Sequence, residues 1–236
     1  LEATGVRAWP PDWSDAAHLL TQYINHLWSL PNYDCWEELP DKVHIATLCA
    51  LSGGLRAVGR YNDDDEACQS SDVIQRFILD AARPFGHLPK FMGTSAVDAS
   101  LLWACIPFGL LPANHPLMTE TVARIRRDLV GPHGGVHRYA EDSYYGGGAW
   151  LLLTALLGEY LFQVGEVAAA HDTLHWIEEQ SRADGAMPEQ APLDLNDPAM
   201  YEPWIERWGP VAEPLLWSHA AYLRLCHVIG NSREEC

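Results

Sequence analysis

Two glutamates, far apart in the sequence, stand where acid/base chemistry on a sugar could be done. Glu37 belongs to the run Tyr33-Asp34-Cys35-Trp36-Glu37-Glu38, which follows a helical pattern that ends at Pro31. Glu189 lies in the turn-rich segment 184–190, ahead of the tryptophan-bearing run 214–219. Carboxyl groups on two separate loops, each near aromatic rings, indicate one proton donor and one proton acceptor acting on a sugar.

The bulk composition limits the classes of partner. A length of 236 residues fits one domain, and we expect a single domain over residues 1–236. The formal net charge of −17 would repel nucleic acid and anionic membranes, whereas a neutral carbohydrate is unaffected. No apolar stretch approaches the roughly 18 residues of a spanning helix. We therefore expect an oligosaccharide partner, with no nucleic acid and no membrane.

The cysteine pattern bears on the compartment. The six cysteines have wide, irregular spacings without a C-x-x-C pair, which disfavours a disulfide scaffold and a zinc ribbon. Several lie in apolar helical runs, where a free thiol behaves as a small hydrophobe. This pattern favours a reducing, cytoplasmic location.

Apolar periodicity predicts an all-α fold without a convincing strand. The eight expected helices cover residues 18–28, 43–55, 72–82, 100–110, 119–129, 150–162, 168–179 and 215–226. Amphipathic helices alternate with nearly all-apolar ones, which is typical of a ring of hairpins with an outer and an inner layer. Antiparallel hairpins would bring four irregular loops together at one end of that ring, where a pocket is expected.

Three motifs resemble glycoside hydrolase family 15, the glucoamylase-like inverting α-glucosidases. They are Asp34-Cys35-Trp36-Glu37-Glu38, the segment Arg138 to Trp150 with Glu141-Asp142 and Gly146-Gly147-Gly148, and Leu216-Trp217-Ser218-His219-Ala220. The resemblance implies an (α/α)6 barrel of twelve helices, of which this chain would supply about the last eight. The N-terminal hairpins would then come from a companion segment or chain, or be lost.

The resemblance also implies roles for individual residues. Glu37 would be the general acid and Glu189 the general base, with no metal or other cofactor. Substrate contacts would come from Trp36, Glu38, Arg138, Tyr139, Tyr145, Trp150 and Trp217. The activity implied is exo-acting and inverting, releasing β-D-glucose from the non-reducing end of short α-gluco-oligosaccharides. An α-1,6 linkage of the isomaltose type is slightly favoured over α-1,4, and an α,α-1,1 hydrolase of the trehalase type is an alternative.

The chemistry sets a condition on Glu37. Inversion needs a gap of about 6.5–9.5 Å between the two carboxyl groups, and the acid must stay protonated near neutral pH. A helix N-terminus near Glu37 would favour its ionised form, so Trp36 and the charges of Glu38 and Glu189 must outweigh it. Six other acidic residues share the long loop with Glu189 and are rivals for the base: Asp184, Asp194, Asp197, Glu202, Glu206 and Glu213.

Other interpretations remain open. Arg138 could pair with Asp142 on the surface, although glycines 146–148 indicate a backbone that approaches a ligand closely. His133 with His137, and His171 with His175, have metal-ligand spacing but lack a third ligand, so surface histidines are favoured. The acidic run 62–66 suggests a Mg²⁺-dependent prenyl-diphosphate enzyme, although its loop position favours a solvated turn. A non-catalytic carbohydrate-binding domain is the third alternative.

Overall fold

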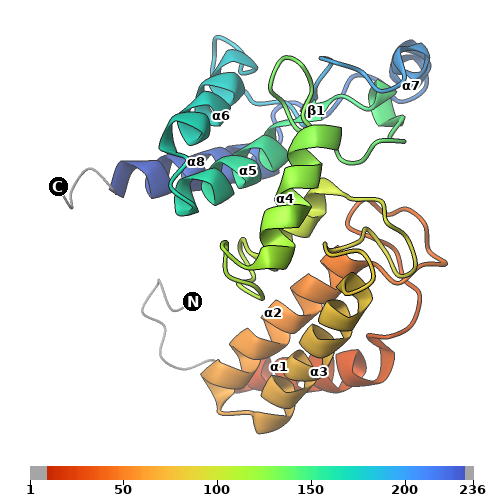
Figure 1. Ribbon diagram of the computed structural model, residues 1–236, viewed down its shortest axis with the longest axis vertical. Helices are drawn as coiled ribbons and strands as arrows, with labels where there is room; N and C mark the ends of the chain where they lie inside the picture. The colour runs from red at the N-terminus through yellow and green to blue at the C-terminus, as the bar shows by residue number, and fades with distance from the viewer. Residues whose placement is uncertain (1–9, 232–236) are drawn as a thin grey trace.

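The computed structural model describes residues 10–231 and is mainly helical (Figure 1). The α-helices of this part are α1 (Pro11–Leu27), α2 (Ile45–Asn62), α3 (Asp65–Ala82), α4 (Pro116–Asp128), α5 (Leu151–Gln163), α6 (Val167–Glu179), α7 (Tyr201–Trp208) and α8 (Leu216–Asn231). Three short 3-10 helices lie between them: η2 (Ala99–Ala104), η3 (Tyr144–Gly146) and η4 (Pro198–Met200). The predicted all-α class is confirmed.

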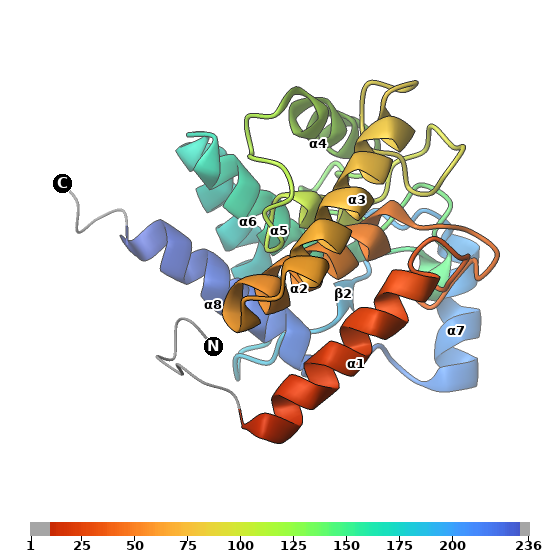
Figure 2. The ribbon, with the colours of Figure 1, turned by 90° about the horizontal axis from the view of Figure 1, so that it is seen from below.

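Two helical hairpins form the framework. In the first, α2 ends at Asp63, which has a left-handed backbone, and the side chain of Asp64 then caps α3 by accepting from the amide of Ala67. Figure 2 shows α2 and α3 side by side, with α1 lying alongside α2. The acidic run 62–66 therefore serves as a helix connection, which explains its residue types without a bound metal.

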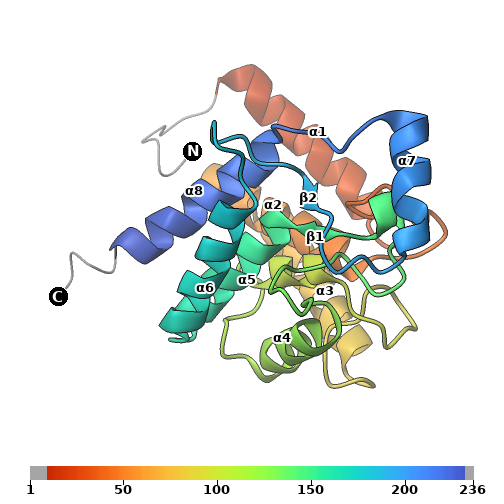
Figure 3. The same ribbon diagram turned by 90° about the horizontal axis from the view of Figure 1, so that it is seen from above.

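The second hairpin joins α5 and α6, and α8 packs against both (Figure 3). Every residue of α5 from Leu151 to Leu161 is buried, as predicted for the apolar run 150–162. One hydrophobic core runs from α2 and α3 through η2 and α4 to α5, α6 and α8. This core holds the loops of the candidate site on a rigid base.

Two predictions about helices are wrong. Residues 100–110 form only the six-residue 3-10 helix η2, because Pro107 lacks an amide hydrogen and its ring clashes with a helical backbone before it. Most of their apolar side chains are nevertheless buried, with Trp103 and Phe108 only partly so; the pattern predicted burial largely correctly and geometry wrongly. Helix α7 was expected to be loop, although Tyr201, Trp204, Ile205 and Trp208 recur at helical spacing; the run is only eight residues long and none of them is buried.

A short strand pair also went unpredicted. Strands β1 (Ala149–Trp150) and β2 (Gln190–Ala191) are antiparallel, with Ala149 opposite Ala191 and Trp150 opposite Gln190. Two residues are too few to show the alternation by which a strand is recognised in a sequence. The pair nevertheless joins two loops that lie 40 positions apart in the chain.

The helices predicted to form a buried inner layer are more exposed than predicted. Helix α2 buries only part of its surface, and α8 leaves Leu216 82% and Leu223 64% exposed. On α1, Trp13, Leu19, Leu20 and Tyr23 are also exposed. Among the described α-helices, only α5 is buried along almost its whole length. None of the helices in residues 10–231 combines the length and apolar character needed to cross a bilayer.

Candidate active site

The turn that carries Trp36, Glu37 and Glu38 is organised by Asp34. One carboxylate oxygen of Asp34 accepts from the amides of Trp36 and Glu38, both at 2.9 Å, and its carbonyl accepts from the amide of Glu37 at 3.2 Å. Glu37 has a left-handed backbone, φ 61°. The turn therefore leaves Glu37 exposed and places Glu38 in a polar cluster.

The expectation of a helix N-terminus at Glu37 is wrong. Helix α2 begins at Ile45, and the residues between them form a turn and two isolated β-bridges. The helix dipole acts within about one turn of a helix end, and α2 does not begin within one turn of Glu37.

Arg138 is the centre of the polar cluster and is only 3% exposed. Its Nε donates to Asp142 at 2.7 Å and its Nη2 donates to both Asp142 and Glu38, the latter at 3.2 Å. The Tyr139 hydroxyl donates to the second oxygen of Glu38. Burial lowers the pKa of Arg138, but the hydrogen bond and charge of Asp142 and the charge of Glu38 outweigh it and raise the pKa. The guanidinium is a fixed positive charge.

The predicted pairing of Arg138 with Asp142 is confirmed, but the pair is buried and not on the surface. Glu38 joins it from a loop 100 positions away. The neighbouring glycines allow other backbone segments of the protein to approach closely. A Cβ on Gly147, at φ 67°, would lie 2.1 Å from the carbonyl oxygen of Asp142, and one on Gly148 would lie 2.4 Å from that of Ala191. These glycines permit close loop packing, and the close approach of this backbone to a ligand stays a prediction.

Four aromatic rings surround the guanidinium of Arg138. The carbon Cζ lies 5.2 Å from the ring centre of Trp36, 5.4 Å from Tyr139, 5.0 Å from Tyr144 and 5.4 Å from Trp150. Trp36 and Trp150 are also in contact, with ring centres 5.2 Å apart. Cation–π contact of this kind fixes the rings around the charge. The result is an aromatic wall with carboxylates at its edge.

Glu189 reaches this cluster through the strand pair. Its amide donates to the carbonyl of Ala212 at 3.0 Å, and the Ser218 hydroxyl at the start of α8 holds the carbonyl of Pro188 at 2.8 Å. The next residue, Gln190, pairs with Trp150, and its side-chain oxygen accepts from the amide of Gly148 at 2.8 Å. Glu189 thus has a defined position relative to the Arg138 loop.

The environment of Glu189 opposes its ionisation. Burial raises the pKa of its carboxyl group, and the Tyr144 hydroxyl and the Arg138 charge lower it only in part. Its Oε2 is buried without a hydrogen-bond partner in residues 10–231. The same contact, with burial as the larger cause, raises the pKa of Tyr144 to about 12. Such a carboxylate holds a proton more tightly than a free glutamate and is a stronger base when ionised.

The structure brings together most of the predicted residues. Trp36, Glu38, Arg138, Tyr139 and Trp150 form one cluster, and Tyr144 links it to Glu189. Tyr145 is buried behind this cluster, where its hydroxyl donates to Gly209 at 2.8 Å. Trp217 instead packs on Trp103, with ring centres 6.4 Å apart, and lines a second cavity with Glu159 and Arg224.

Several residues of the cluster were not predicted as site residues. The buried Lys90 lies 3.4 Å from Asp98 and against the ring of Tyr139, with Nζ 2.9 Å from the ring centre. Asp98, which caps η2 by accepting from the amide of Ser100, also accepts from the indole nitrogen of Trp36 at 3.1 Å. The only sequence signal for a role of Lys90 and Asp98 was that these two charged residues flank a loop that precedes a run of buried residues.

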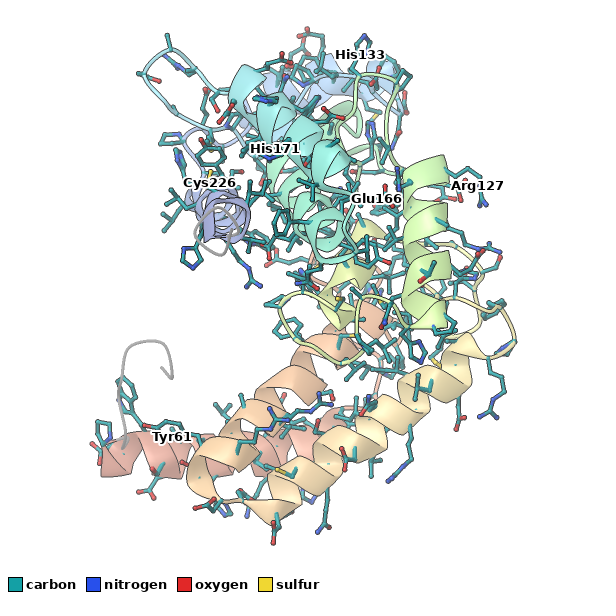
Figure 4. The ribbon with its side chains drawn as sticks, turned by 60° about the vertical axis from the view of Figure 1, so that its left-hand side comes forward. Tyr61, Arg127, His133, Glu166, His171 and Cys226 are labelled. Atoms are coloured by element: carbon teal, nitrogen blue, oxygen red, sulfur yellow. The ribbon has the colours of Figure 1, made fainter. Side chains whose placement is uncertain are left out.

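The histidine pairs do not point to a metal. His133 binds Asp194, with 2.7 Å between Nδ1 and the carboxylate, while the buried His137 contacts the carbonyl of Gly147 at 2.7 Å. His171 lies on α6, away from the His133 loop (Figure 4). No group of three or more potential metal ligands occurs in the described residues.

We expect Asp142→Ala to destabilise the fold by about 3 kcal/mol, because it leaves the buried Arg138 charge with only a partial partner. Equilibrium unfolding in urea measures the loss. Asp128→Ala is the matched control, since Asp128 pairs with Arg127 on the surface and its loss should change stability little. Equal losses for the two variants would contradict a special role for the buried pair.

A helical framework presents two carboxyl groups beside an aromatic wall with a fixed positive charge, an arrangement suited to acid/base chemistry on a sugar. The family model of glycosyl hydrolases family 15 matches residues 8–181, and the chain belongs to this family. The chain is 42% identical over 224 residues to isomaltose glucohydrolase of Kribbella flavida, covering 92% of this chain and 58% of the relative. It is 29% identical over 218 residues to an uncharacterised glycosyl hydrolase of Methanocaldococcus jannaschii, covering 82% and 33%.

Solved structures agree on the fold. A glycosidase variant in complex with glucose superposes with a TM-score of 0.84 at 42% identity, covering 88% of this chain and 57% of that one. A bacterial glucoamylase complexed with acarbose gives 0.72 at 22% identity, with 92% and 38% covered. These likenesses identify the fold as an (α/α)6 barrel, as predicted. The chain spans just over half the length of the Kribbella relative.

Proposed function

We propose that this chain is part of an exo-acting, inverting α-glucoside hydrolase that releases β-D-glucose from short α-gluco-oligosaccharides. The observation that carries the proposal is the convergence of the Trp36 turn, the Arg138 loop and Glu189 around one aromatic wall. Membership of family 15 supports a glycosidic substrate. The 42% identity to an isomaltose glucohydrolase supports an α-1,6 linkage.

In the proposed reaction Glu37 donates a proton to the glycosidic oxygen, and the leaving sugar departs with it. Glu189 removes a proton from a water molecule, whose oxygen attacks the anomeric carbon from the opposite face and inverts it. Arg138 and Glu38 form a rigid polar pair for sugar hydroxyl groups, and the rings of Trp36 and Trp150 provide apolar contact. The reaction balances with water alone, so we propose no cofactor.

We infer that further helices cover the exposed apolar faces of this chain and complete a single catalytic domain. An apolar groove between α1 and α2 is lined by Trp13, Ala17, Leu20, Ile24, Leu55 and Val58. Leu216 and Leu223 expose a second apolar face on α8. Both faces would be enclosed in the longer relatives if their remaining helices close the ring. Closure would also shield Glu37 and help it keep its proton.

This inference predicts a context-dependent effect of Leu223→Lys. In this chain alone the side chain is 64% exposed, so we expect little change in urea unfolding. In a protein that includes the covering helices, the same change should destabilise by about 2–3 kcal/mol, since it buries a charge or opens the interface. A negligible effect in both would contradict the covering of α8.

A proton NMR time course on isomaltose, maltose and trehalose, using the protein that contains this chain, tests the function. We expect β-glucose to appear first, and fastest from isomaltose. Initial release of the α-anomer would overturn the inverting mechanism, and a preference for trehalose would support the trehalase-type alternative. Binding of sugar without any hydrolysis would support a non-catalytic carbohydrate-binding domain instead.

We expect Tyr144→Phe to move the acidic limb of the pH–activity profile to higher pH. The Tyr144 hydroxyl lowers the pKa of Glu189, so its removal raises that pKa further, and the base becomes protonated earlier as pH falls. The measurement is kcat/KM between pH 4 and 8. Tyr145→Phe is the matched control, because its hydroxyl binds the Gly209 carbonyl and should leave the limb unmoved.

A further inference from the structure

His44 lies beneath the turn that carries Trp36, Glu37 and Glu38, and it is 1% exposed. Its ring nitrogen Nε2 is 3.0 Å from the carbonyl oxygen of Leu39, at the end of the turn. Its other nitrogen, Nδ1, is 4.0 Å from Oδ2 of Asp34, at the start of the turn. One imidazole ring therefore faces both ends of the turn.

The partners of His44 constrain its protons. A carbonyl oxygen only accepts hydrogen bonds, so Nε2 must carry a hydrogen. In a neutral ring Nδ1 would then be an acceptor facing a carboxylate, which is also an acceptor. Both atoms are buried, and neither has a hydrogen-bond partner in residues 10–231. Two buried acceptors that face each other without a proton between them are unfavourable.

The 4.0 Å between Nδ1 and Oδ2 is about 1 Å longer than a direct hydrogen bond, so a movement of that size by either side chain would form one. That bond requires a hydrogen on Nδ1.

We propose that His44 is an imidazolium, protonated on both nitrogens, which binds Asp34 and Leu39 at once and holds the catalytic turn in shape. Asp34 then uses one carboxylate oxygen for the amides of Trp36 and Glu38 and the other for His44. His44 is a positioning residue, since it acts on Glu37 and Glu38 through Asp34. The catalytic part of this proposal rests on the proposed function, while the protonation of His44 does not.

The turn needs such support because of its backbone. Glu37 and Leu39 both have positive φ, 61° and 49°, which non-glycine residues adopt only when surrounding contacts hold them there. His44 contacts the carbonyl of Leu39 directly. It therefore fixes the residue that closes the turn and, through Asp34, the amides on either side of Glu37.

The other groups around His44 allow this charge. The ring of Phe91 meets it edge-on, with ring centres 6.0 Å apart, and is neutral. Asp41 and Lys42, on the same loop, are paired to each other and largely cancel. Helix α2 begins just after His44 and its N-terminus opposes a positive charge, but the helix end is equivalent to about half a charge whereas the carboxylate of Asp34 carries a whole one.

Long-range nitrogen–proton NMR of the protein that contains this chain tests the protonation directly. We expect both ring nitrogens of His44 to carry a proton at pH 7, and Asp34→Asn to return the ring to a neutral form. His171, on the surface of α6, serves as the internal reference. A neutral His44 with hydrogen only on Nε2 at pH 7 would overturn the proposal, whether or not the protein hydrolyses isomaltose.

A double-mutant cycle tests the positioning role. We expect His44→Gln and Asp34→Asn each to lower kcat on the order of 10- to 100-fold, because a misplaced catalytic group costs this much. KM should change little, and the double variant should be no worse than either single one. Circular dichroism and Tm identify variants that fail to fold. If a variant does not fold, the proposal is decided by the NMR measurement of His44 in the unaltered protein. Additive losses in folded variants would contradict action through Asp34.

Discussion

Glu189→Gln is expected to lower kcat about 10²- to 10⁴-fold and, at neutral pH, to raise Tm. The activity falls because the amide cannot take a proton from water. The stability rises because burial gives Glu189 a higher pKa in the folded protein than its ordinary value of 4.5. The folded state then binds this proton more tightly, so ionisation of Glu189 works against folding.

The stability gain expected from Glu189→Gln depends on pH. The stability cost is absent below pH 4.5, where the group is protonated in both states, and complete once the pH exceeds the raised folded pKa. The gain from Glu189→Gln should therefore be present at pH 7 and vanish near pH 4. Thermal melts at both pH values, beside kcat on isomaltose, measure the two effects.

Rival acidic residues supply the controls for Glu189. Glu202→Gln and Glu206→Gln change exposed side chains on α7, in the same long segment between β2 and α8. We expect neither to alter kcat or Tm by a measurable amount. If either abolished hydrolysis while Glu189→Gln did not, the base would have to be reassigned.

The second large effect is expected for Glu37→Gln, which should also lower kcat on isomaltose about 10²- to 10⁴-fold. A glutamine cannot donate the proton that the leaving sugar requires. The carboxylate is exposed, so unfolding in urea should be unchanged. This separates Glu37 from Glu189, whose replacement changes stability as well.

The leaving group distinguishes the two roles further. Fluoride departs from α-glucosyl fluoride without a proton donor, so Glu37→Gln should retain much of its activity on this substrate, whereas Glu189→Gln should not. Glu141→Gln, an exposed glutamate on the Arg138 loop, is the matched control and should behave as wild type. If Glu37→Gln lowered the activity on isomaltose and on α-glucosyl fluoride equally, Glu37 would not be the general acid.

Helix positions could be predicted because their signal is local. The apolar run that became α5 and the amphipathic run within α3 show their periodicity within a few turns. The run 100–110 shows the limit of this signal, since its composition predicts burial while Pro107 prevents a continuous helix. Helix α7 shows apolar residues at helical spacing, but over only eight residues, which is too short a run to identify a helix by periodicity.

Site residues divide in a similar way. The Trp36 and Arg138 segments carry recognisable motifs, and the structure places them together. Trp217 also lies in a motif, but it packs on Trp103, apart from the Arg138 cluster. Lys90 and His44 carry no motif, and their positions beneath the site depend on packing of residues distant in the chain.

The sequence by itself determined the all-α class, most helices and two of the three segments that meet at the site, because periodicity and motif spacing are short-range properties. Tertiary structure alone decided that Arg138 binds Glu38 from 100 positions away, that strand β2 places Glu189, and that Asp34 faces His44. These contacts depend on how the helices pack. No local pattern of residue types encodes that packing, which decides which charges are buried and which protons they hold.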